Sequence, residues 1–113
     1  MTSINKEVAE ALTKGKTVSL YLNGLTEIDS ETAIALGSGK TRGIYLNGLK
    51  SINLDSINGL TLKTVEFLAI EGITYINNDI AKALITFETR EFRKLFVSDQ
   101  VRGIIEAVKE GKD

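Results

Sequence analysis

A 24-residue repeat runs through the chain, and this period constrains the fold more than any other feature of the sequence. Residues 20–25 (LYLNGL) return at residues 44–49 (IYLNGL) and again, with more changes, at residues 68–73 (LAIEGI). The period predicts stacked units that bury their apolar faces against one another, with Leu46 fully buried at the centre. The aligned apolar columns are Leu20/Ile44/Leu68, Leu22/Leu46/Ile70, Leu25/Leu49/Ile73, Ile28/Ile52/Ile76, Ala33/Ile57/Ala81 and Leu36/Leu60/Leu84.

Within each unit the columns predict a strand, a turn and a short helix. Leu20 and Leu22 alternate with period two, as in a strand with one buried face. The following glycine, Gly24 in the first unit, suits either a turn with positive φ or a close approach of the neighbouring unit. Asp29 is typical of a helix N-cap, and an acid two residues later favours the first helical turn. The equivalents are Gly48 and Gly72, Asn53 and Asn77, and the acids Glu31, Asp55 and Asp79.

The period predicts one repeat domain over residues 1–113. Residues 1–15 read as the helical half of a unit and form an N-terminal cap, residues 16–87 form three units, and residues 88–113 form a C-terminal cap. In the second unit, Asn58-Gly59 is poor helix material and predicts only a 3₁₀ turn. The ends of the pattern are less regular than its centre.

The repeat register fails after residue 87. Residues 88–97 contain either an edge strand at 92–97 or a helix continuing from residue 88, and the pattern favours the strand. Residues 99–109 predict a helix capped by Ser98. Its apolar face is made of Val101, Ile104, Ile105 and Val108.

These columns resemble the leucine-rich repeat family, in particular its short, irregular bacterial type. Residues 18–22, 44–46 and 65–70 match the strand part of that pattern, and the resemblance covers residues 4–87. The chain departs from the family where the buried asparagine ladder is expected, since Leu25, Leu49 and Ile73 stand there. The resemblance implies an α/β solenoid with strands on its concave side that binds other macromolecules, and it does not imply an enzyme.

Composition narrows the functional classes. Lys and Arg total 14 against 15 Asp and Glu, so no basic surface is expected for nucleic acid. The chain has neither cysteine nor histidine, which removes the thiolate, the commonest general base and the commonest metal ligand. No long apolar run predicts a membrane span, and the first residues do not resemble a signal peptide. We therefore expect a cytoplasmic protein without a cofactor, although export by another route stays open.

Three local motifs suggest chemistry, and each has a simpler interpretation. Residues 37–41 (GSGKT) resemble a phosphate loop, but Ile34 stands where its first glycine belongs, and GKT also occurs at residues 15–17. Asn77, Asn78, Asp79 and Asp55 suggest calcium without the EF-hand spacing. Asp29 with Glu31 could serve as an acid–base pair, but capping explains both. We expect no nucleotide site, no metal site and no catalytic residue.

The candidate binding residues lie on the strand face that points away from the core. Because Leu20 and Leu22 point inward, their neighbours point outward, and the three units together predict an aromatic patch of Tyr21, Tyr45 and Phe67. One interpretation is cross-strand packing that stabilises the sheet. The other is a binding surface, because aromatic residues dominate interface hot spots. The predicted polar rim is Asn23, Asn47 and Glu71, and Tyr75 on the turn after the third strand is predicted to extend the surface.

The sequence favours a non-catalytic protein-binding module that acts through this face as a small inhibitor or adaptor of another protein. The alternative is a structural subunit that associates with itself, for example as a homodimer through an edge strand or a solenoid end. An enzyme or nucleotide binder is less favoured. The identity of the partner does not follow from the sequence.

Overall fold

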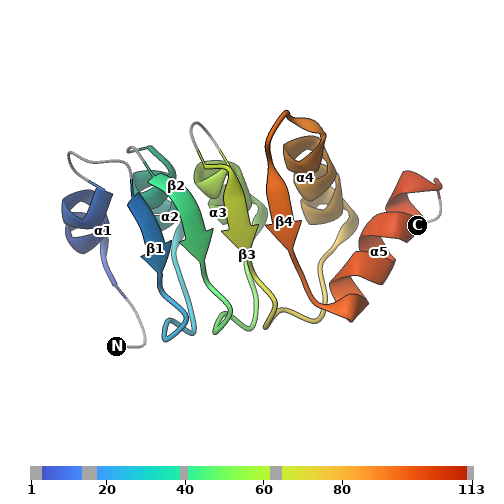
Figure 1. Cartoon of the computed structure of the whole chain (residues 1–113). Coiled ribbons are helices and arrows are strands. Elements are labelled where there is room, and N and C mark those ends of the chain that lie inside the picture. Colours follow the sequence, from blue (N-terminus) through green and yellow to red (C-terminus); the bar gives the residue numbers. More distant parts are fainter. Residues whose placement is uncertain (1–3, 14–17, 39–40, 62–64, 112–113) are drawn as a thin grey trace.

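The chain forms a mixed α/β structure in which a parallel sheet is covered by helices. The computed structural model describes residues 4–13, 18–38, 41–61 and 65–111. In this part of the chain, four strands follow one another across the sheet in sequence order, and five helices lie behind and beyond them (Figure 1). The elements are α1 (Lys6–Thr13), β1 (Val18–Tyr21), α2 (Ser30–Ser38), β2 (Thr41–Tyr45), α3 (Leu54–Leu60), β3 (Phe67–Ala69), α4 (Asn78–Thr89), β4 (Lys94–Phe96) and α5 (Asp99–Lys109).

The columns of the repeat stand side by side in the sheet. Leu20 pairs with Ile44, and Ile44 pairs with Leu68 in the next strand. The helices follow the same order, since α1 packs on α2, α2 on α3 and α3 on α4. Each residue column of the sequence therefore becomes a row across the molecule.

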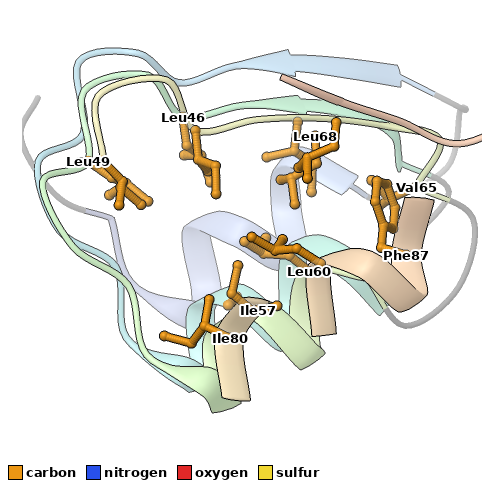
Figure 2. Packing of buried hydrophobic residues seen from close by; sticks show 14 of the residues in the cluster. Leu46, Leu49, Ile57, Leu60, Val65, Leu68, Ile80 and Phe87 are labelled. Carbon is orange, nitrogen blue, oxygen red and sulfur yellow. The ribbon is translucent and has the colours of Figure 1, made fainter. Parts of the chain in front are cut away.

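The core lies between the sheet and the helices. Leu46 is fully buried, as predicted, and faces the helix residues Ile57 and Leu60 across the core (Figure 2). The central and C-terminal members of the columns are almost all inaccessible to solvent, whereas Leu22 and Ile28 at the β1 end are only partly buried. The fully buried large side chains are Phe87, Leu25, Leu36, Ile44, Leu46, Leu49, Ile57, Leu60, Leu68, Ile70, Ile73 and Leu84.

The predicted helix caps are confirmed. The Asn53 side chain accepts a hydrogen bond from the Ser56 N–H at 2.8 Å, and Asn77 accepts from the Ile80 N–H at 2.9 Å. These oxygens satisfy backbone donors that the first helical turn leaves without partners. Asn5, Asp29 and Ser98 cap α1, α2 and α5 in the same way.

The prediction of a 3₁₀ turn in the second unit was wrong, because α3 is a regular α-helix. The Asn53 cap supports its first turn, and its glycine is needed for packing. A Cβ on Gly59 would lie 2.8 Å from the Ile34 backbone nitrogen, and one on Gly37 would lie 2.0 Å from the Gly59 carbonyl oxygen. Close packing of α2 on α3 therefore outweighs the weak helix propensity of Asn58-Gly59.

The repeated glycines after the strands allow neighbouring turns to approach each other. A Cβ on Gly48 would lie 2.1 Å from the Asn23 carbonyl oxygen, and one on Gly72 would lie 2.2 Å from that of Asn47. Of the described residues, only Phe92 and Gly111 have a positive φ. The close-approach interpretation of this column is therefore confirmed, and positive φ is not the reason.

The C-terminal region contains the favoured strand, and a helix follows it. β4 pairs with β3 through Leu68 and Leu95, so this step of the repeat is longer than the earlier steps, which join Leu20 to Ile44 and Ile44 to Leu68. The following helix, α5, buries Val101 and Ile105 and half-buries Ile104 and Val108. No helix in the described ranges is long and apolar enough to cross a membrane.

Candidate functional site on the outer face of the sheet

The outer face of the sheet, opposite the helices, carries two rows of side chains. Because Leu20, Ile44, Leu68 and Leu95 point into the core, the residues on either side of them in each strand point outward. Backbone pairing sets the order within each row. The first row is Ser19, Gly43, Phe67 and Lys94, and the second row is Tyr21, Tyr45, Ala69 and Phe96.

Two of the predicted aromatic residues form a stacked pair. The ring centroids of Tyr21 and Tyr45 lie 4.6 Å apart, and the rings are within 4° of parallel. Direct pairing of these residues across β1 and β2 produces this spacing, which is close to the distance between strands. Tyr21 is 71% exposed, while Tyr45 is partly covered. The pair is a flat apolar surface with two phenol hydroxyl groups.

The third predicted aromatic residue lies in the other row. Phe67 stands between Gly43 and Lys94, and it is not level with Tyr45. No ring contact joins Phe67 to the tyrosine pair in the described structure. A Cβ on Gly43 would lie 3.2 Å from Cε2 of Tyr45, so the missing side chain leaves room for that ring. The structure therefore brings together two of the three predicted rings.

Phe96 belongs to this face and was missed by the sequence reasoning. It is 40% exposed at the far end of the tyrosine row, beyond Ala69, which is buried. The regular step of the repeat does not place Phe96 beside Ala69, because the step between β3 and β4 is longer. Only the alternation around Leu95 in the predicted edge strand could have indicated its direction.

The predicted polar rim is a ladder of hydrogen bonds between turns. The Asn23 Oδ1 atom accepts from the Asn47 N–H at 2.9 Å, and the Asn47 Oδ1 atom accepts from the Glu71 N–H at 2.8 Å. Both asparagines therefore fix the spacing of the turns. Their amide groups lie beside the tyrosine row, just beyond the carboxyl ends of β1 and β2. This ladder lies at the outer rim, away from the Leu25 column where the family resemblance implies one.

Tyr75 is exposed but lies off the sheet. It stands between the buried residues Ile73 and Ile76 on the segment that joins β3 to α4, and it is 73% exposed. It belongs to neither outer row, and its ring makes no ring contact in the described residues. It can extend a surface only for a partner that reaches around the end of the strands.

The charges around the outer face are few and partly paired. Arg42 and Glu66 form an ion pair of 3.0 Å that precedes the outer residues of β2 and β3. Lys94 is exposed at the end of the Phe67 row. The tyrosine row itself carries no charge, so it would meet a partner through apolar and hydroxyl contacts.

The other motifs give no assembled site among the described residues. Asp29 is a helix cap, and the pKa of its carboxyl is held below the usual value, first by the Thr32 hydroxyl and second by the Thr32 backbone N–H. The described residues contain no group of three or more acidic, histidine or cysteine side chains placed to hold a metal ion. The Gly39-Lys40 part of the phosphate-like motif and the GKT at residues 15–17 lie outside the described residues.

Comparison with family models, curated proteins and solved structures finds no match to this chain. The outer face must therefore be interpreted from its own residues. Its main feature is the stacked pair of Tyr21 and Tyr45, which is level with Phe96 and bordered by the asparagine ladder.

Proposed function

We propose that this chain is a non-catalytic protein-binding module and that its partner docks on the outer face of the sheet. The observation that carries the proposal is the stacked pair of Tyr21 and Tyr45, with Tyr21 71% exposed. Aromatic residues are enriched among the interface positions that contribute most to binding. Leaving a ring of this size in water gives no benefit to the chain alone beyond its contact with one neighbour.

The proposal includes a fold of the leucine-rich-repeat type, a short α/β solenoid with helical caps. The equal spacing along the chain of paired residues in β1, β2 and β3 supports it, as does the repeated cap at Asp29, Asn53 and Asn77. In such a fold each strand adds the same outward positions to one continuous face. A partner would then contact a row of side chains on a flat face and would not enter a cleft.

The partner must be larger than a short peptide to use this face fully. Four strands at about 4.8 Å spacing give a face roughly 15–20 Å wide. A standard interface needs about 800 Å² from each partner, so contacts must extend to the rim at Asn23, Asn47 and Glu71. Tyr75 is the exposed aromatic residue that a partner reaching past the rim would meet.

An enzymatic role receives no support from the same residues. The acids that start the helices act as caps or first-turn residues, as Asp29 does toward Thr32. The chain has no histidine or cysteine to serve as a base or nucleophile. A small inhibitor or adaptor, which works by covering a partner's surface, needs neither.

Sheet packing is the competing explanation for the tyrosine pair, and a binding experiment separates the two. The tagged chain would be used to capture partners from an extract of its source cells, with mass spectrometry as the readout. The Tyr21→Ala/Tyr45→Ala double variant should lose the captured partner while keeping its circular dichroism spectrum and monodispersity. Ile34→Ala, which removes a 45% exposed apolar side chain from the helical side, is the matched control and should retain the partner.

The affinity of the recovered partner then gives the magnitude. Truncating a hot-spot aromatic residue costs about 2 kcal/mol or more of binding free energy, which is at least about thirtyfold in Kd. Normal binding by the double variant would show that the pair only stabilises the sheet. The binding surface would then have to be sought on the helical side or at the C-terminal cap.

A further inference from the structure

The helix layer extends one position further than the sheet at the N-terminal end. α1 packs beside α2, as α2 packs beside α3. A strand covers this side of the core in each later unit, but β1 is the first strand of the described sheet. Figure 1 shows α1 lying beyond β1, with no strand of the described residues in front of it. We name this place, next to β1 and over α1, the vacant strand position.

Two apolar side chains of α1 belong to columns of the repeat that are buried in the later units. Val8 and Leu12 are 38% and 39% exposed. The residues in their columns are buried in the units that have a strand: Thr32, Ser56 and Ile80 are at most 5% exposed, and Leu36, Leu60 and Leu84 are 0% exposed. Ala9 is fully buried, as are Ala33 and Ile57 in its column. Val8 and Leu12 are therefore the members of these two columns that are left exposed, and they stand in the helix that has no described strand over it.

The edge of β1 offers hydrogen bonds to the same position. The Leu22 N–H donates to the Tyr45 carbonyl at 2.8 Å, so Leu20 and Leu22 direct their backbone groups toward β2. Because backbone groups alternate in direction along a parallel strand, those of Ser19 and Tyr21 point away from β2, toward the vacant strand position. β1 carries none of the charges or prolines that usually protect an edge strand. A hollow of about 200 Å³, lined by Tyr21, Leu22, Gly24 and Leu25, lies at the same edge.

The opposite edge of the sheet is closed. The Arg102 guanidinium donates to the outward carbonyl of Leu95 in β4 at 3.3 Å. Two hydrogen bonds to the Glu88 carboxylate, at 2.9 and 3.1 Å, hold that guanidinium in place. α5 buries Val101 and Ile105 beyond this edge. Of the two edges of the described sheet, the one at β1 is therefore the open one.

We propose that the vacant strand position binds one extended segment of another protein, which adds to the sheet as a strand parallel to β1. Such β-augmentation obtains affinity from backbone hydrogen bonds and specificity from alternate side chains. The segment would cover Val8 and Leu12. It would form hydrogen bonds with the backbone groups of Ser19 and Tyr21 that point away from β2. This proposal does not depend on the outer face being a binding surface.

A second copy of the folded chain does not fit the position. If β1 of a second copy lay beside β1, its own α2 would lie below it and occupy the space already filled by α1. A head-to-tail contact through β4 is blocked by Arg102 and α5. Only a strand without its own helix satisfies both restrictions, and an extended segment of a partner is such a strand.

The register of the sheet predicts the sequence that the position prefers. Two apolar residues separated by one residue would face Val8 and Leu12, as Leu20 and Leu22 face the core one unit later. An asparagine directly after the second apolar residue would accept from the Asn23 N–H, because Asn23 accepts in this way from the Asn47 N–H. The preferred segment is therefore apolar-x-apolar-Asn-Gly, as at residues 20–24.

A synthetic peptide with the sequence of residues 18–25 (VSLYLNGL), fluorescently labelled at its N-terminus, is the probe. Its anisotropy should rise saturably when the intact chain is added. N-methylation of the leucine that corresponds to Leu22 removes an N–H that would bond to the Tyr21 carbonyl, and should weaken binding at least about tenfold. N-methylation of the tyrosine that corresponds to Tyr21 alters an N–H that faces away, and should have a much smaller effect. Equal effects of the two methyl groups, or no saturable binding of the parent peptide, would overturn the proposal.

Variants of the chain locate the peptide. Leu12→Lys and Val8→Lys place a charge under the added strand and should each weaken binding about tenfold or more. Ile34→Lys, a change of similar exposure on α2, should not. The N-methyl comparison uses the unaltered chain, so a folding defect in one variant cannot decide the result. A chain whose mass by light scattering is twice 12.3 kDa, and becomes 12.3 kDa in Leu12→Lys, would identify a second copy as the occupant and refute the proposed one.

Discussion

One added methyl group at Gly48 tests the stacking of the units. In Gly48→Ala the new Cβ would lie 2.1 Å from the Asn23 carbonyl oxygen and 2.7 Å from that of Leu25. Non-bonded heavy atoms prefer a separation of about 3.5–4.0 Å. Both neighbouring atoms belong to the backbone, so no side chain can rotate away. The turn of β2 must move about an ångström or more from the turn of β1.

That movement lowers the free energy of unfolding, through overpacking and through strain on the hydrogen bonds nearby. The Leu22 N–H bond to Tyr45 and the Asn23 bond to the Asn47 N–H, at 2.8 and 2.9 Å, cross the same gap. Overpacking costs about 1–3 kcal/mol, and each weakened hydrogen bond adds about 1 kcal/mol. We therefore expect Gly48→Ala to lower the free energy of unfolding by about 2–5 kcal/mol, a large part of the roughly 5–15 kcal/mol typical of a domain.

Gly103→Ala is the matched control for this change. A Cβ at Gly103 meets no atom within 4 Å, and the residue lies inside α5. Replacing an exposed helical glycine by alanine gains about 1 kcal/mol, so this variant should be more stable than the parent chain. Urea unfolding followed by circular dichroism measures both. A loss of no more than about 0.5 kcal/mol in Gly48→Ala, the range of an ordinary surface substitution, would refute the close approach of the turns.

Further predictions concern the core, the ladder and the cap of α2. Leu46→Asp should abolish cooperative thermal unfolding, since an unpaired charge at a fully buried site costs several kcal/mol; a normal melt would contradict the register. Asn47→Ala should lower stability by about 0.5–1.5 kcal/mol in urea, whereas Asn47→Asp, which keeps an acceptor for the Glu71 N–H, should lose less. The pKa of Asp29 is lowered by folding, so its stabilisation is present above its unfolded pKa and is lost as the pH falls through the folded one. The melting temperature of Asp29→Asn should therefore fall less than that of the parent chain below about pH 4; parallel curves would contradict this.

The sequence predicted best what repeats. Strand pairing such as Leu20 with Ile44, the cap at Asn53 and the burial of Leu46 all follow from a column seen three times. Each is a local rule that the neighbouring unit repeats, so tertiary packing has no reason to override it. The Ser98 cap was predictable without the repeat, because it precedes a strongly amphipathic helix.

The sequence predicted less where packing overrides a local rule or the period changes. The regular helix at Asn58-Gly59 depends on contact with Ile34 in α2. The helix propensities of the residues in α3 give no information about that contact. Phe96 was missed because the period lengthens between β3 and β4. The separation of Phe67 from the tyrosine pair was readable in principle, because Phe67 shares its column with Gly43 and not with Tyr45. Two outward-pointing residues on neighbouring strands contact each other when they lie in the same row across the sheet. Pointing to the same face of the sheet is not sufficient.

The two proposed surfaces meet at Tyr21, and this gives them a physical connection. Tyr21 is the exposed end of the tyrosine row and also the residue whose outward carbonyl an added strand would use. An outward side chain of that strand would lie over the exposed face of the Tyr21 ring, at about the same spacing as Tyr45 on its other face. The row would then be longer by one position, and Tyr21 would change from its exposed end to an inner member. A segment with an aromatic residue there, as in VSLYLNGL, should therefore alter the affinity of the outer-face partner, and one with glycine there should alter it less. Unchanged partner affinity at saturating peptide would show that the two surfaces act independently.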